Sequence, residues 1–154
     1  MPDAVAILAL LLSLPPLCMA WQPPPSGLVA QTVRWAMGIS PHLNDREPGA
    51  TEPEVGAIRR SWSGGKAELK SKHASTEVWV RPLFDGAIAV AAFNKGERPA
   101  QVDVVWKELG IAGQPQVRDA LLGTDMGKVH AGFAVKLPAG GAALYRVLPA
   151  SRGR

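Results

Sequence analysis

The sequence predicts an all-β fold, an antiparallel β-sandwich, over residues 66–149. Three observations predict it. From Glu77 onward, apolar residues alternate with polar ones at a period of two, as in strands that bury one face. Turn residues separate these runs roughly every 8–15 residues. The chain also has 16 glycines and 14 prolines in 154 residues, an excess that favours short strands joined by turns.

The sandwich opens with a predicted hairpin. Glu77–Arg81 is a strand that ends at Pro82. Asp85-Gly86 forms the turn, because glycine accepts the positive φ that tight hairpin turns require. Ala87–Phe93 follows and is apolar on both faces. This pattern predicts a central strand that is covered on both sides.

Four further strands are predicted, and most follow from the same alternation. They are Gln101–Trp106, Gln116–Asp119, Ala131–Leu137 and a last strand with Ala143, Tyr145 and Val147 on one face. A seventh strand is expected over Ala67–Ser71. Inward-facing positions are expected at Val102, Val104, Trp106, Ala131, Phe133, Val135 and Leu137.

Residues 1–20 form an apolar leader. Val5–Leu14 is too short to cross a membrane, which takes about 20 apolar residues, so no stable membrane span is expected. A secretory signal peptide fits better, with Cys18–Ala20 before a cleavage point at Trp21. In that case the protein is secreted or periplasmic. A positively charged start is missing, however, and an apolar helix is an equal interpretation.

Residues 21–27 form a proline-rich linker, and residues 28–65 lead to the sandwich. Leu28–Met37 has apolar residues near helical spacing, with Leu28, Thr32 and Trp35-Ala36 on one side. Ser40-Pro41 is expected to end this helix. Such a helix must pack on the sandwich or expose Trp35, Met37 and Ile39, and that exposure would favour self-association.

Composition excludes several functional classes. The formal net charge is +4, but the basic residues are scattered, so no nucleic-acid partner is expected. A single cysteine, Cys18, excludes an intrachain disulfide and a cysteine-based zinc site. His42, His73 and His130 lack the spacing of metal ligands and are predicted to be surface residues. No metal site and no cofactor are predicted.

Several ordered motifs resemble the C-terminal β-sandwich of family 27 glycoside hydrolases, the α-galactosidases and α-N-acetylgalactosaminidases. They are Glu77–Leu83, Asp85-Gly86, Ala89–Ala91, Phe93-Asn94, Gly96, Trp106–Gly110, Val117–Asp119 and Pro138…Gly141…Leu144. Upstream, Arg34–Pro41 with Asn44-Asp45 is similar to that family's last barrel helix and strand. Pro53–Val55 with Ala57-Ile58 is similar to its segment entering the linker. The family's usual linker is replaced by Arg59–Gly64, which puts normal docking of barrel and sandwich in doubt.

The resemblance implies a family activity of retaining α-galactoside hydrolysis on a (β/α)8 barrel with two catalytic aspartates. Motifs carrying those aspartates have no counterpart in this chain, so no catalytic residue is predicted. The carboxyl candidates in the sandwich favour turn or surface roles. They are Asp85, Glu97, Asp103, Glu108, Asp119 and Asp125. Asp119 and Asp125 flank a loop with Gly123 and Gly127, which is a weak signal for a cation.

Three tryptophans are the candidate carbohydrate-binding residues, because flat apolar sugar faces stack on indole rings: Trp62, Trp79 and Trp106. The pattern favours the competing interpretation, in which they pack in a core or a domain interface. Three functional hypotheses follow. The chain is a truncated glycoside hydrolase that is inactive alone, a stand-alone carbohydrate-binding or accessory module, or a subunit of a separately encoded barrel. Galactosides or a catalytic barrel are the implied partners.

Overall fold

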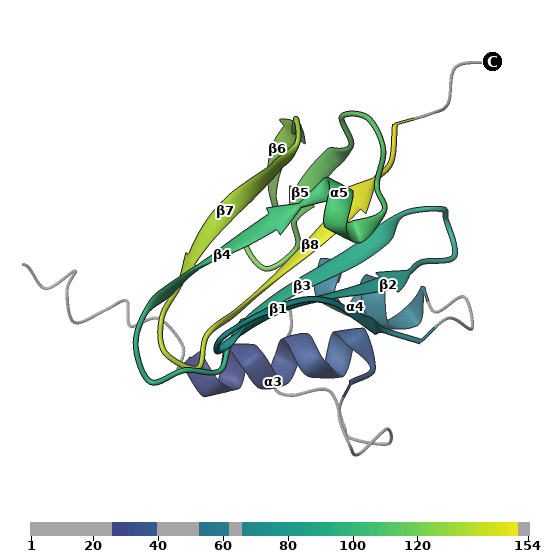
Figure 1. Cartoon of the computed structure of the whole chain (residues 1–154). Helices are drawn as coiled ribbons and strands as arrows, with labels where there is room; N and C mark the ends of the chain where they lie inside the picture. Colours follow the sequence, from purple (N-terminus) through teal and green to yellow (C-terminus); the bar gives the residue numbers. More distant parts are fainter. Residues whose placement is uncertain (1–25, 40–52, 62–65, 151–154) are drawn as a thin grey trace, which may run out of the picture.

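The structure, a computed structural model, describes residues 26–39, 53–61 and 66–150 (Figure 1). Its elements follow one another in the order α3 (Ser26–Met37), α4 (Pro53–Arg60), β1 (Glu68–His73), β2 (Thr76–Pro82), β3 (Ile88–Asn94), β4 (Ala100–Val105), α5 (Trp106–Leu109), β5 (Gln116–Asp119), β6 (Thr124–Lys128), β7 (Gly132–Leu137) and β8 (Ala142–Leu148). The predicted leader, most of the proline-rich linker, the segment with His42 and Asn44-Asp45, Trp62, and residues 151–154 of the basic tail predicted at 150–154 lie outside these residues.

The strands form two antiparallel sheets. The large sheet has the order β1-β2-β3-β8-β5-β6, and β4 and β7 pair as a second, two-stranded sheet that lies over it (Figure 1). Helix α3 runs along the opposite face of the large sheet, beside α4. The described part of the chain therefore has three layers: helices, large sheet and small sheet. The predicted antiparallel β-sandwich is confirmed.

Two apolar cores lie on the two faces of the large sheet. The inner core lies between the sheets and contains the predicted face of β8, namely Ala143, Tyr145 and Val147. The outer core lies between the large sheet and the two helices. Strand β3 contributes to both cores, because Val90 and Ala92 point inward while Ala89 and Ala91 point outward. The prediction of a doubly covered central strand is thereby confirmed.

The predicted turns and the seventh strand are also present. Gly86 has a φ of +82°, and the Asp85 side chain accepts a hydrogen bond from the Ala87 N–H, which closes the hairpin turn. The seventh strand is β1, shifted slightly along the chain from Ala67–Ser71. None of the helices in the described ranges is long and apolar enough to span a membrane.

Three predictions about elements are wrong. Trp106 does not end β4 but begins the one-turn helix α5. Ala131 does not point inward: it is exposed, with a φ of +63°, in the turn before β7. The loop around Asp125 contains an additional strand, β6, which the sequence pattern did not predict. Its residues are mostly exposed on both faces, so they carry no apolar alternation.

The buried face of α3 also differs from the prediction. The helix begins at Ser26, inside the predicted linker, and ends at Met37 with Gly38 in the left-handed region. Its buried residues are Ala30, Val33, Ala36 and Met37, so of the predicted set only Ala36 is buried, and Leu28 is 44% exposed. Met37 is only 1% exposed, which removes one reason to expect self-association.

Asn94, at the end of β3, links two turns by hydrogen bonds. Its buried amide nitrogen contacts the carbonyl oxygens of Arg98 (2.8 Å), Pro138 (3.1 Å) and Leu137 (3.2 Å). Its Oδ1 accepts a hydrogen bond from the Gly96 N–H at 2.9 Å. Buried polar groups are costly when they lose their partners.

We therefore expect Asn94→Ala to lower the free energy of unfolding by about 2 kcal/mol, because it leaves buried carbonyl groups without a donor. Urea unfolding followed by tryptophan fluorescence measures this. Gln101→Ala is the control. The side chain of Gln101 is exposed, and it donates a hydrogen bond to the exposed carboxylate of Asp103. Equal stabilities of the two variants would contradict the role of Asn94.

Candidate functional site

The interface between the helices and the large sheet contains the outer core. Its apolar centre is formed by small residues of β3, Ala89 and Ala91, beneath buried residues of α3. Val33 of α3 and Val55 of α4 are fully buried there. Short alanine side chains let a helix approach the sheet closely, and the larger helix residues then fill the space. We call this surface the helix-docking face.

Two arginine side chains, one from β2 and one from α4, bind the C-terminal end of α3. Arg81 on β2 is 3% exposed and donates from Nη1 to the carbonyl oxygen of Ala36 at 2.8 Å. Arg59 of α4 donates from Nη1 to the carbonyl oxygen of Trp35 at 3.2 Å, and its guanidinium lies over the Trp35 ring. The last carbonyl groups of a helix lack donors within the helix, and these two arginines supply such donors.

A group of ion pairs binds α4 to strand β5 of the large sheet. Arg118 on β5 contacts Glu54 of α4 (Nε to Oε1, 2.6 Å) and Asp125 of β6 (Nη1 to Oδ2, 3.5 Å). The hydrogen bond from Arg118 to Glu54 raises the pKa of the arginine. Arg146 stands directly opposite Arg118 in the sheet register and pairs with Asp85. Each arginine thus has its own carboxylate, which offsets their mutual repulsion.

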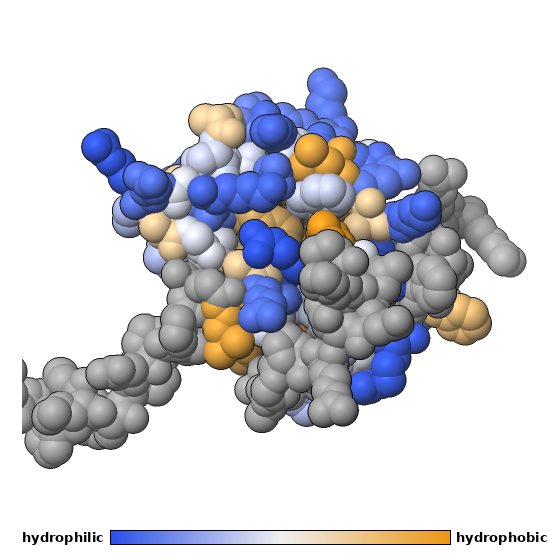
Figure 2. Space-filling view, turned by 90° about the horizontal axis from the view of Figure 1, so that it is seen from below, coloured by the Kyte–Doolittle hydropathy of each residue, from blue (hydrophilic) through white to orange (hydrophobic). Residues whose placement is uncertain are grey.

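Other contacts extend the helix-docking face along α3. The guanidinium of Arg34 lies 5.5 Å from the centre of the Phe93 ring on β3, in cation–π geometry. Trp79 is half-buried against the outer core, and its indole N–H donates to Glu77 at 3.1 Å. Viewed from the helix side, visible apolar side chains lie in small groups among polar ones (Figure 2). Exposed Leu28 and Phe84, at 44% and 81%, are among the large apolar residues at the surface.

Glu77 is the buried carboxylate of this region, 6% exposed. Burial alone would raise its pKa, but the hydrogen bond from Trp79 and the ammonium of Lys95, 3.1 Å away, outweigh burial. The pKa of Glu77 therefore lies below its ordinary value. A carboxyl group with a lowered folded-state pKa contributes stability above its unfolded-state pKa, and this contribution is lost as pH falls through the folded-state value.

Replacing Glu77 by glutamine is therefore expected to flatten the acid side of the stability profile. The wild type should lose more stability than Glu77→Gln between pH 5 and pH 3, by up to about 1 kcal/mol, because Lys95 is half-exposed and screened by water. Urea midpoints measured at several pH values from 7 to 3 test this. Parallel profiles for the two proteins would show that Glu77 does not carry the effect.

The three candidate tryptophans are not brought together. Trp79 lies on the helix side of the large sheet, whereas Trp106 lies in the inner core, 2% exposed, with its indole N–H donating to the carbonyl oxygen of Val129 at 2.9 Å. Trp62 is outside the described residues. Trp106 also contacts Phe133 edge to face, with ring centres 5.6 Å apart. Trp79 and Trp106 therefore serve as packing groups in this structure.

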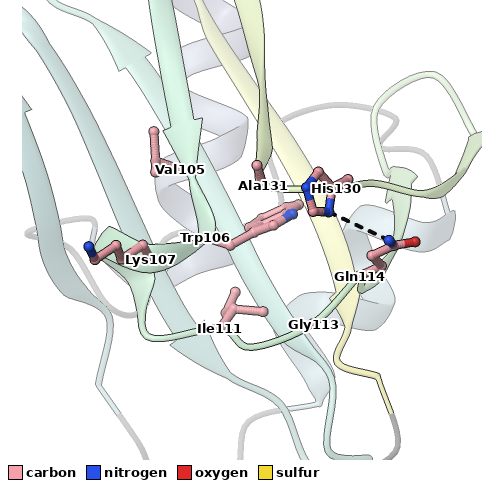
Figure 3. A pocket seen from close by; sticks show the side chains of 8 residues that line it. All are labelled: Val105, Trp106, Lys107, Ile111, Gly113, Gln114, His130 and Ala131. Carbon is pink, nitrogen blue, oxygen red and sulfur yellow. Dashed lines mark hydrogen bonds between the residues drawn. The ribbon is translucent and has the colours of Figure 1, made fainter.

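Trp106 nonetheless borders an open hollow of about 600 Å³ at one end of the sandwich (Figure 3). Val105 and Ile111 add apolar surface, and the side chains of Gln114 and His130 lie 3.5 Å apart at its edge. Sequence reasoning did not predict this hollow, because its walls come from α5 and from two loops that are distant in the chain.

The candidate carboxyl groups have structural partners or are exposed. Asp119 accepts hydrogen bonds from the N–H groups of Leu121 and Leu122, both at 3.0 Å, and so holds the turn before β6. Asp125 pairs with Arg118, so Asp119 and Asp125 serve different functions. In the described residues, no group of three or more histidine, cysteine or acidic side chains is placed to hold a metal ion. His73 and His130 are exposed, as predicted.

The fold is that of a β-sandwich domain that carries helices on the outer face of its large sheet. Residues 73–147 match the family model described as the alpha galactosidase C-terminal beta sandwich domain. In these glycosidases the catalytic barrel is a separate domain. The resemblance drawn from the sequence motifs is thereby confirmed. No protein among curated sequences matches the chain.

Solved structures agree with this assignment. A GH27 β-L-arabinopyranosidase from Geobacillus stearothermophilus is 25% identical, with a TM-score of 0.69, and the match covers 84% of this chain and 32% of that enzyme. α-Galactosidase I from Mortierella vinacea shares the fold at 16% identity, with a TM-score of 0.70 and coverage of 84% and 37%. An Arthrobacter globiformis isomalto-dextranase shares it at 20% identity and a TM-score of 0.66, with coverage of 84% and 25%.

The extent of these matches includes more than the sandwich. Residues 66–150 are 85 of the 154 residues, about 55%, so a match over 84% of the chain also takes in residues before β1. The chain itself spans about a third of the length of the Geobacillus enzyme.

Proposed function

We propose that this chain is the non-catalytic, barrel-docking part of a family 27 glycoside hydrolase. The observation that carries the proposal is the helix-docking face: α3 and α4 are buried on a sandwich of the α-galactosidase C-terminal family. By sequence resemblance, the end of α3 is similar to the last helix of the catalytic barrel, and α4 is similar to the segment that enters the linker. The large sheet then serves as the surface on which the end of a barrel is held, and the catalytic carboxylates belong to that barrel.

Affinity purification from the cells that produce the protein tests this proposal. The full chain, tagged at its C-terminus, should retain peptides of a (β/α)8 glycoside hydrolase barrel, either in the same polypeptide or in a second one. The purified chain alone should not hydrolyse chromogenic α-galactosides or β-L-arabinopyranosides. A stable monomer without any barrel sequence, or turnover by the purified chain in the absence of a barrel, would overturn the proposal.

A stand-alone carbohydrate-binding module is the second candidate, and the hollow beside Trp106 is the observation that favours it. Its volume suits a single sugar ring, and it combines apolar walls with the polar side chains of Gln114 and His130. Trp106 is only 2% exposed, so binding would not use its full stacking face. Titration of tryptophan fluorescence with galactose and galactosides, up to millimolar concentration, tests this role. A saturable change that Trp106→Phe alters would support it, and a flat titration would exclude it.

A further inference from the structure

The C-terminal end of α3 is held by the sandwich in an unusual way. Arg81 reaches the Ala36 carbonyl oxygen from β2, 45 residues further along the chain, and the contact is buried. Arg59 reaches the neighbouring carbonyl oxygen of Trp35 from α4. Two cationic side chains from different elements thus meet at one helix end, where the partial negative charge of the helix dipole favours them.

Placing a guanidinium group in an apolar core is costly, and a second one nearby adds to the cost. Burial, together with the charge of Arg59, lowers the pKa of Arg81. Leucine or methionine would fill the same space without this cost. The bond to the helix end is the specific property that arginine provides and an apolar residue does not.

Gly38 lies beside both arginines. Its φ is +70°, and a Cβ atom at this position would lie 3.3 Å from Nη1 of Arg59 and 3.5 Å from Nη1 of Arg81. The chain therefore leaves α3 through a glycine that turns beside two guanidinium groups. The N–H groups of Gly38 and Ile39 bond back to the carbonyl oxygens of Trp35 (3.2 Å) and Arg34 (3.0 Å).

We infer that Arg81 is a positioning residue that fixes where the chain leaves α3. It ties the exit at Gly38 and Ile39 to the rigid large sheet through Ala36. The end of α3 is similar to the family's last barrel helix, so Arg81 would hold the end of that helix in place on the sandwich. This last step rests on the proposed function, whereas the fixing of the helix end does not.

Hydrogen exchange of the full chain, followed by mass spectrometry, separates this role from a general contribution to stability. In Arg81→Met, the amides of Gly38 and Ile39 should exchange about tenfold faster or more, because the Ala36 carbonyl loses its donor and the helix end opens locally. Amides of β3 and β8 should keep their wild-type rates. Arg81→Lys should restore part of the protection, since lysine also donates a hydrogen bond.

Arg118→Met is the matched control. Arg118 is an arginine of the same sheet, but its side chain contacts α4, β6 and the turn between β5 and β6, and not the end of α3. Its replacement should leave the exchange of Gly38 and Ile39 unchanged. Wild-type exchange at these two amides in Arg81→Met would overturn the inference. So would an equal acceleration in every element, which would indicate only a loss of global stability.

The outcome is independent of the search for a barrel. If no barrel sequence accompanies the chain, the proposed function fails, while local opening in Arg81→Met still establishes the positioning role. If a barrel is found but exchange at Gly38 and Ile39 does not respond, the positioning role fails and the docking function stands.

Discussion

Replacing Gly132 with alanine is expected to destabilise the sandwich by about 3–5 kcal/mol. Gly132 opens β7 opposite Val105 of β4, with a φ of +142°. A Cβ atom built at this position would lie 2.0 Å from the carbonyl oxygen of Val104. The obstacle is a backbone atom of the paired strand, so no side-chain rotation relieves it. The two strands would have to separate, and their small sheet covers the inner core.

Gly127→Ala is the matched control for this prediction. Gly127 also has a positive φ, +73°, but a Cβ atom there has nothing within 4 Å. Its replacement should therefore cost only the strain of the left-handed conformation, about 1 kcal/mol. Chemical unfolding of both variants, followed by circular dichroism, gives the two values. Similar losses for the two would show that close contact at Gly132 is not the cause.

The central strands could be predicted from the sequence because the apolar residues that mark their burial are consecutive in the chain. β3 is apolar at every position from Ala89 to Phe93, and only a strand covered on both faces buries such a run. β6 could not be predicted in this way. It contacts β5 through backbone pairing and through the ion pair of Asp125 with Arg118, and its residues are mostly exposed, so no apolar pattern marks it.

Helix α4 was missed although a signal was present. Pro53 is its first residue and Glu54 follows, as is usual in the first turn of a helix, and Arg59-Arg60 lies in its last turn. These residues were instead interpreted only through their resemblance to a linker. In contrast, no local pattern predicts the partner of Arg81. Its acceptor is a backbone atom of a helix 45 residues away, and only the packing of that helix brings it near.

A second large loss of stability is expected for a charged residue in the outer core. Val33 lies at the middle of α3 and is fully buried against the large sheet. Val33→Asp would place a carboxylate among apolar side chains and is expected to destabilise the protein by about 3–5 kcal/mol. If the helices and the sandwich form one cooperative unit, fluorescence and circular dichroism should show the same, earlier unfolding midpoint in urea.

Gln31→Asp provides the comparison, because it introduces the same side chain two residues earlier on the exposed side of α3. It should cost a few tenths of a kcal/mol, since only helix propensity changes. Two separate transitions in Val33→Asp, with the sandwich unfolding at its wild-type midpoint, would contradict the single unit. A single shifted transition would mean that the cooperative folding unit includes α3, because the sheet face beneath the helix requires that cover to stay folded in water.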